Sequence, residues 1–119
     1  MKWILILIVL TSLCSCTNKS KVPSDVIPKQ KMELVLWDMI KADRFAVQYI
    51  LRDSLVEDKE TKRFETFELV FQVHDISSQE FIHSMKFYMS RPDLTKVLLD
   101  TISARANRSK AELFSPTLQ

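Results

Sequence analysis

The chain contains no glycine in its 119 residues, and this absence limits the folds that it can adopt. Glycine supplies the positive backbone φ angles of tight hairpin turns, and it also forms phosphate-binding loops and ends many helices. Folds built on tight β-hairpins or on a glycine-rich phosphate loop are therefore disfavoured. The composition favours helices that are joined by breaks of Ser, Asp, Asn and Pro.

Apolar residues recur at spacings of three and four, which is the pattern of helices that bury one face. Pro28 and Pro92 suit the first position of a helix, and Ser77 with Glu80 forms a capping-box pattern. We predict helices at about 28–52, 60–74, 78–89 and 92–110. Since single helices of this length are marginal in water, they must pack together. The predicted fold class is all-α, a small bundle of about four helices.

The helical spacing also predicts which residues face the core. The expected inward positions are Met32, Val35, Met39, Ala42, Ala46 and Tyr49 in the first helix, Phe64, Phe67, Val70, Phe71 and His74 in the second, Phe81, Met85, Tyr88 and Met89 in the third, and Leu94, Val97, Leu98, Thr101 and Ile102 in the fourth.

The N-terminus has the organisation of a bacterial secretory signal. A positively charged start precedes an apolar run over 3–10, which is shorter than the roughly 20 residues of a membrane-spanning helix. The segment Leu13-Cys14-Ser15-Cys16 resembles a lipobox, and this resemblance implies cleavage before Cys16 and acylation of its thiol. The expected organisation is a signal peptide at 1–15, a lipidated N-terminus and tether at 16–27, a helical domain at 28–112 and a C-terminal tail at 113–119.

Ionisable residues within the helices are candidates for chemistry. Asp38 and Asp43 point about 140° apart on a helix, so we expect structural bonds rather than a paired-carboxylate site. His74, followed by Asp75, continues an apolar stripe, and we interpret it as a partly buried histidine at a helix end. The residues to which we assign structural polar roles are Asp38, Asp43, His74, Asp75, Ser77 and Glu80.

Glu80 and His83 have the i, i+3 spacing of di-iron carboxylate bundles, but such sites need a second copy and further glutamates. The chain has only two histidines. We therefore expect no metal, no cofactor and no catalytic residue. The rival hypothesis is a small metal-binding or catalytic helical protein that uses Asp38, His74, Asp75, Glu80 or His83.

Aromatic and methionine residues cover more of the third helix than one inward face needs. This suggests a partner-binding surface, although a plain core with this helix between its neighbours is the alternative. The candidate partner-binding residues are Phe81, Ser84, Met85, Phe87, Tyr88 and Met89. A third hypothesis is a lipid or small-molecule binder with an apolar cavity between helices.

Two segments resemble the Bacteroidota lipoproteins that carry the domain of unknown function 4296. The first runs from Val26-Ile27-Pro28 through Trp37-Asp38-Met39 to Ala42-Asp43, although Ile40 stands where many members carry His. The second segment contains Phe71, His74-Asp75-Ile76-Ser77, Phe81, Ser84, Tyr88 and Pro92-Asp93-Leu94. The resemblance covers roughly 26–102. It implies a helical lipoprotein of the cell envelope and brings no known activity.

These observations lead to one expected role. The chain has 17 Lys+Arg and 15 Asp+Glu, a near-balance that gives no reason to propose nucleic acid as a partner. The expected partners are the membrane, through the N-terminal lipid, and another envelope protein. Bacteroidota lipoproteins that are exported to the cell surface often carry an acidic cluster next to the lipidated Cys. Since no such cluster follows Cys16, the resemblance implies the periplasmic face of the outer membrane rather than the cell surface. We expect a non-catalytic protein-interaction or assembly module.

Overall fold

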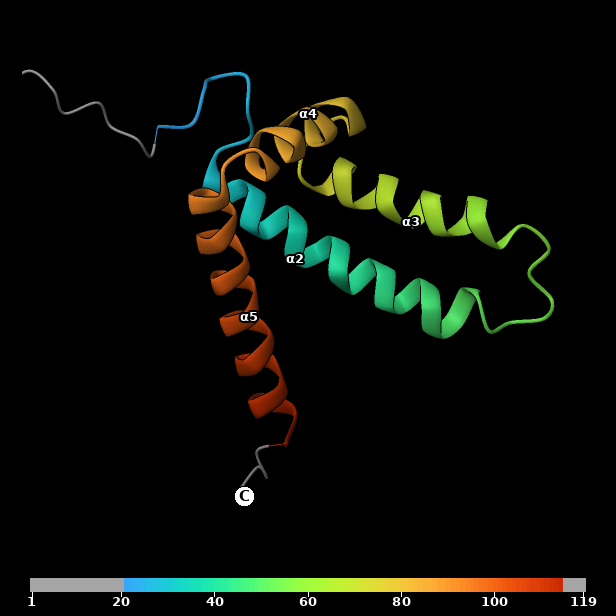
Figure 1. Cartoon of the computed structure of the whole chain (residues 1–119). Coiled ribbons are helices and arrows are strands. Elements are labelled where there is room, and N and C mark those ends of the chain that lie inside the picture. Colours follow the sequence, from blue (N-terminus) through green and yellow to red (C-terminus); the bar gives the residue numbers. More distant parts are fainter. Residues whose placement is uncertain (1–20, 115–119) are drawn as a thin grey trace, which may run out of the picture.

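The computed structural model describes residues 21–114, and these form an all-helical domain (Figure 1). The elements are α2 (Lys29–Phe45), the π-helix η2 (Ala46–Ile50), α3 (Lys59–Val73), α4 (Ser78–Met89) and α5 (Pro92–Phe114). Since η2 continues α2, the segment described contains four helical rods, and the predicted all-α bundle is confirmed. The expected signal peptide, the expected lipidation site at Cys16 and residues 115–119 of the expected tail lie outside this segment.

The helices α2 and α3 form an antiparallel hairpin whose loop spans residues 51–58 (Figure 1). Asp58 caps the start of α3, because its carboxylate accepts a hydrogen bond from the Thr61 N–H at 3.1 Å. The Lys59 ammonium donates to the Leu51 carbonyl at 2.9 Å. The loop is thereby connected to the first turn of α3.

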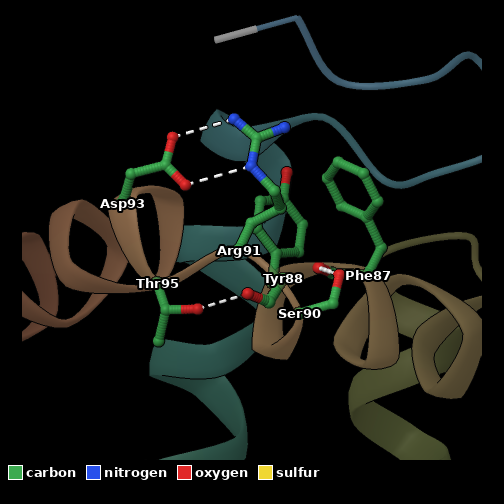
Figure 2. Close-up of polar contacts among 6 residues, drawn as sticks. All are labelled: Phe87, Tyr88, Ser90, Arg91, Asp93 and Thr95. Carbon is green, nitrogen blue, oxygen red and sulfur yellow. Dashed lines mark hydrogen bonds and ion pairs between the residues drawn. The ribbon is translucent and has the colours of Figure 1, made fainter. Parts of the chain in front are cut away.

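The short helix α4 turns back across the open end of this hairpin, and α5 follows it after a tight junction (Figure 1). At this junction the Thr95 hydroxyl donates to the Tyr88 carbonyl, and the Arg91 guanidinium binds Asp93 at 2.8 Å (Figure 2). Ser90 donates to the Phe87 carbonyl at 2.7 Å. The end of α4 and the start of α5 are therefore joined by side-chain hydrogen bonds without any glycine.

The core lies where the chain segment before α2 meets α4 and the first half of α5. Its buried side chains are Val26, Ile27, Met32, Tyr88, Leu94 and Leu98. From this point α2 and α5 start side by side and run apart, so that together they form a V (Figure 1). No helix within residues 21–114 is long and apolar enough to cross a membrane.

Four residues that the helical spacing placed inward are instead exposed, namely Tyr49 at 58%, Phe64 at 63%, Met89 at 71% and Val97 at 43%. The prediction for Tyr49 is wrong because it lies in η2, where the wider π turn rotates the side chains that follow α2. Phe64 lies in the second turn of α3 and Met89 is the last residue of α4, and neither position is covered by another helix. Val97 is next to Leu98 in the sequence, but it points away from the helix face on which Leu94 and Leu98 are buried.

Candidate functional site

Asp38 of α2 and His74 at the end of α3 form an ion pair between the two helices, with 2.7 Å between the Asp38 Oδ2 and His74 Nε2 atoms. Lys41, one turn along α2, binds the other carboxylate oxygen at 2.5 Å. Burial raises the pKa of Asp38, but the hydrogen bonds from Lys41 and His74 outweigh it and hold that pKa below its ordinary value. His74 is partly buried as predicted, with 14% of its side chain exposed.

Asp43 does not point toward Asp38. Its carboxylate accepts two hydrogen bonds from the Arg63 guanidinium of α3, at 2.6 and 3.1 Å, and Arg63 also lies over the Phe67 ring. The pKa of Arg63 is raised by its hydrogen bond to Asp43. The two aspartates therefore act as separate cross-links between α2 and α3, in agreement with the expected structural bonds, and the sequence did not identify either partner.

Asp75 adopts a left-handed backbone with φ of 50°, the conformation for which glycine is usually selected. The Asp75 N–H donates to the Gln72 carbonyl and the Ile76 N–H to the Phe71 carbonyl, both at 3.1 Å. These two bonds form a Schellman motif, which ends α3 without glycine. Asp75 is exposed, and it contributes to this turn through its backbone.

The capping box predicted at the start of α4 is present. Ser77 accepts from the Glu80 N–H at 3.1 Å, and Glu80 accepts from the Ser77 N–H at 2.7 Å. The bond from the Ser77 N–H, followed by the bond from its hydroxyl, holds the pKa of Glu80 below its ordinary value. The Glu80 carboxylate therefore serves as a cap at the N-terminus of α4.

His83 lies one turn beyond Glu80 and contacts Asp25 at 3.0 Å, with both side chains more than half exposed. Within residues 21–114, no three His, Cys, Asp or Glu side chains lie close enough to hold a metal ion. Glu80 and His83 are thus used by different neighbours and do not converge on one point.

Ser84 and Tyr88 of α4 hold the backbone of Ile27. The Ser84 hydroxyl accepts from the Ile27 N–H and the Tyr88 hydroxyl donates to the Ile27 carbonyl, each at 2.8 Å. Ser84 is fully buried and Tyr88 is 1% exposed. Burial, followed by the nearby negative charge of Glu33, raises the pKa of Tyr88. This four-residue spacing on one helix face satisfies both polar groups of a buried backbone residue.

The predicted partner-binding set on α4 is therefore not one surface. Ser84 and Tyr88 face the core and hold Ile27, while Phe81, Met85 and Phe87 are partly buried against that core. Only Met89 of the six is exposed. Most of this set is covered within the domain, because α4 contacts Ile27 through Ser84 and Tyr88, α3 through the Phe71–Phe81 ring pair, and α5.

The groove between α2 and α5 is the hollow that best fits a binding role, and sequence reasoning missed it. It encloses about 320 Å³, near the lower end of the range for ligand sites. Its apolar lining includes Trp37 and Ile40 of α2 with Ile102, Ala106 and Leu113 of α5. Leu113 is 80% exposed. The sequence does contain a pattern that could have indicated this groove. The helical spacing of Leu94, Leu98 and Ile102 continues through Ala106 and Ser109 to Leu113, beyond the part of α5 that packs in the core.

Basic residues surround this apolar lining. Lys41, Arg44 and Lys110 line the groove, and Arg105 and Arg108 line a hollow next to it that shares Trp37. The one carboxylate in these two linings is that of Glu112. Within the segment described, Arg44, Arg105, Arg108 and Lys110 have no ion-pair partner. The groove therefore combines an apolar floor with a positive rim.

The fold and these contacts define a small all-α domain with an open groove between two diverging helices. Residues 23–112 match the family model described as a domain of unknown function, DUF4296, which covers most of the chain, so the protein belongs to the DUF4296 family. No curated protein and no solved structure matches the chain. The family membership agrees with the resemblance seen in the two sequence segments, and it assigns no activity.

Proposed function

We propose that the protein is a non-catalytic envelope lipoprotein whose helical domain binds another protein. In this proposal, Cys16 is acylated and holds the domain at the outer membrane, on the periplasmic side. The single observation that supports the binding role is the groove, which apolar residues of α2 and of the outer half of α5 line together. Apolar side chains arranged in this way are what a docked helix covers in groove-binding complexes.

The direction of the groove supports a partner away from the lipid anchor. Val26 and Ile27, which precede α2, pack against Leu94 and Leu98 in the first half of α5. At this end α2 and α5 start side by side (Figure 1). The groove opens toward the opposite end, between Arg44 and Leu113. In this proposal, a tether attached at the narrow end places the wide end on the side of the domain that is far from the anchor.

Site-specific photo-crosslinking in intact cells tests the binding role. A benzophenone amino acid replaces Ile40 or Leu113 in the groove, and the matched control replaces Ile82, an exposed apolar residue of α4 that lies outside the groove. We expect adducts of one defined mass from the groove positions and none from position 82. Equal adducts at all three positions, or none at any, would contradict the proposed role.

Acylation is tested separately by metabolic labelling with an alkyne fatty acid. The wild-type chain is expected to incorporate the label and to fractionate with the outer membrane, whereas Cys16→Ser incorporates none. Label that persists in Cys16→Ser would refute the anchor.

The rival metal-binding or catalytic function uses the same ionisable residues that the structure places in structural bonds. Elemental analysis of the purified chain distinguishes the two hypotheses. A stoichiometric metal that disappears on His83→Ala or His74→Ala would overturn the non-catalytic proposal in favour of the metal-binding one.

A further inference from the structure

The charges around the α2–α5 groove identify the chemistry of its occupant. We infer that the groove binds an acidic amphipathic helix of another protein, which inserts its apolar face between α2 and α5 and pairs its carboxylates with the basic rim. This inference rests on the proposed protein-binding function and names the class of partner.

The apolar lining has the length of a short docked helix. On α5 it runs from Ile102 to Leu113, about 16 Å at 1.5 Å per residue. On α2 the apolar part runs from Trp37 to Ile40, about 4.5 Å, and the lining continues through Lys41 to Arg44, about 10 Å in all. A ligand helix of about three turns, with apolar anchors at i, i+3 or i+4 and i+7, would cover both walls. Trp37, whose large amphipathic ring lines both hollows, is the expected centre of that contact.

The rim selects for negative charge. Arg44 and Lys110 stand on opposite walls of the groove, and Arg105 and Arg108 extend the positive surface along α5. These four cations have no ion-pair partner within residues 21–114, so each can form an ion pair with a carboxylate of a ligand. Lys41 is already bound to Asp38 and contributes less. Complementary potentials of this kind set the choice of partner and the association rate.

The same charges disfavour a second copy that docks through its own α5. The outer half of α5 carries Arg105, Arg108 and Lys110 against the single carboxylate of Glu112. Two such segments in contact would bring like charges together, which costs free energy. An external acidic helix meets no such repulsion.

Binding of designed peptides to the full chain in phosphatidylcholine nanodiscs tests the inference. The probe is a fluorescent amphipathic peptide of about 18 residues, long enough to be partly helical, with leucines on one face and glutamates on the other. The comparison peptide has lysine in place of every glutamate. We expect the acidic peptide to bind at least about tenfold more tightly in fluorescence anisotropy, and to weaken as salt is raised toward about 0.5 M.

Charge reversal on the rim provides the matched variants. The double variant Arg44→Glu with Lys110→Glu changes two exposed groove residues, and Arg52→Glu with Lys86→Glu makes the same charge change at exposed positions elsewhere. We expect the groove variant to lose about tenfold in affinity for the acidic peptide and to gain affinity for the lysine peptide, while the control keeps the original preference. Because all four residues are exposed, circular dichroism should show both variants folded.

The outcomes separate the inference from the proposed function. If neither peptide binds, or both bind equally, while photo-crosslinking at Ile40 still captures a defined protein, the acidic-helix inference fails and the binding role survives. If crosslinking captures nothing, the proposed function fails. Self-association that disappears in Arg44→Glu with Lys110→Glu, or saturation of the groove by phosphatidylglycerol nanodiscs, would overturn the inference in favour of a second copy or an anionic lipid.

Discussion

Ile27 carries two of the longest-range hydrogen bonds in the domain, and both are made by side chains of α4. A buried N–H or carbonyl that loses its partner costs about 1–3 kcal/mol, more than the bond contributes net when it is present. Ser84 and Tyr88 therefore act mainly by preventing that loss. Ser84 and Tyr88 coincide with positions of the family motif, and their hydrogen bonds to the Ile27 backbone give both positions a structural explanation.

Removing either hydroxyl should destabilise the fold. We expect Ser84→Ala and Tyr88→Phe each to lower the free energy of unfolding by about 1–3 kcal/mol, because each leaves one polar group of Ile27 unpaired. Urea denaturation followed by circular dichroism measures the change. Ser90→Ala, which removes an exposed hydroxyl bonded to the Phe87 carbonyl, is the control and should change little. Wild-type stability in both core variants would show that the Ile27 bonds are not maintained.

Asp75 is the residue at which the absence of glycine has a local cost. A left-handed backbone costs a residue with a Cβ about 1–2 kcal/mol, partly offset by the greater chain entropy that glycine loses on folding. We expect stability to rank Asp75→Gly above wild type and Asp75→Ala below it, with a total spread of about 1 kcal/mol. Thermal and urea unfolding test the order. A ranking with alanine above glycine would contradict the left-handed turn.

At the scale of elements, α2 and α3 are held together by two separate ion pairs, Asp38–His74 and Asp43–Arg63. The second pair lies nearer the hairpin tip, and the first lies at the base beside the Schellman turn. Both are partly exposed, so each contributes less than a buried pair would. Their main effect is to set the register of the two helices.

Stability should therefore fall in acid. The pKa values of Asp38, Asp58 and Glu80 are lowered in the folded state, so their contribution is present in full above their ordinary pKa values and is lost as pH falls through the folded values. We expect the free energy of unfolding to decrease below about pH 4. Urea titrations between neutral and acidic pH measure this decrease. Asp38→Asn should show a smaller decrease, and an unchanged pH dependence in that variant would exclude a role for its carboxylate.

The element types and most helix ends could be predicted because they depend on local chemistry. The capping box at Ser77 and the breaks at Pro28 and Pro92 are read directly from short sequence spacings. The pairs Asp38–His74 and Asp43–Arg63 could not be predicted, because they depend on which helices become neighbours and in what register. The exposure of Tyr49 followed from a π-helix that no residue pattern announces.

At the scale of the whole molecule, α5 has two unlike halves. Leu94, Leu98 and Ile102 are buried in the core, whereas the segment from 103 to Phe114 extends beyond it along the open side of the groove. Packing of an apolar face supplies most of the stability of a protein helix. The outer half of α5 therefore depends on its covalent connection to the packed half.

Hydrogen exchange should reveal this division. We expect amides of residues 103–114 to exchange at least about tenfold faster than those of 96–102, since opening the outer turns breaks few tertiary contacts. Mass spectrometry of peptic fragments measures both segments in one experiment. Saturation with the acidic peptide should slow exchange in 103–114 and leave α3 unchanged. Equal protection along all of α5 without a ligand would contradict the open groove.

The two bonds to Ile27 also have a mechanical consequence. If the chain is anchored at Cys16, as we propose, any pull from a bound partner reaches the domain through the residues that precede α2. Ser84 and Tyr88 hold the backbone of Ile27, two residues before α2 begins at Lys29, so the load passes into α4 and the core and does not unwind α2 from its first turn. A force along the tether would therefore act first on the packed core around Ile27, and α2 would stay helical while the partner is bound.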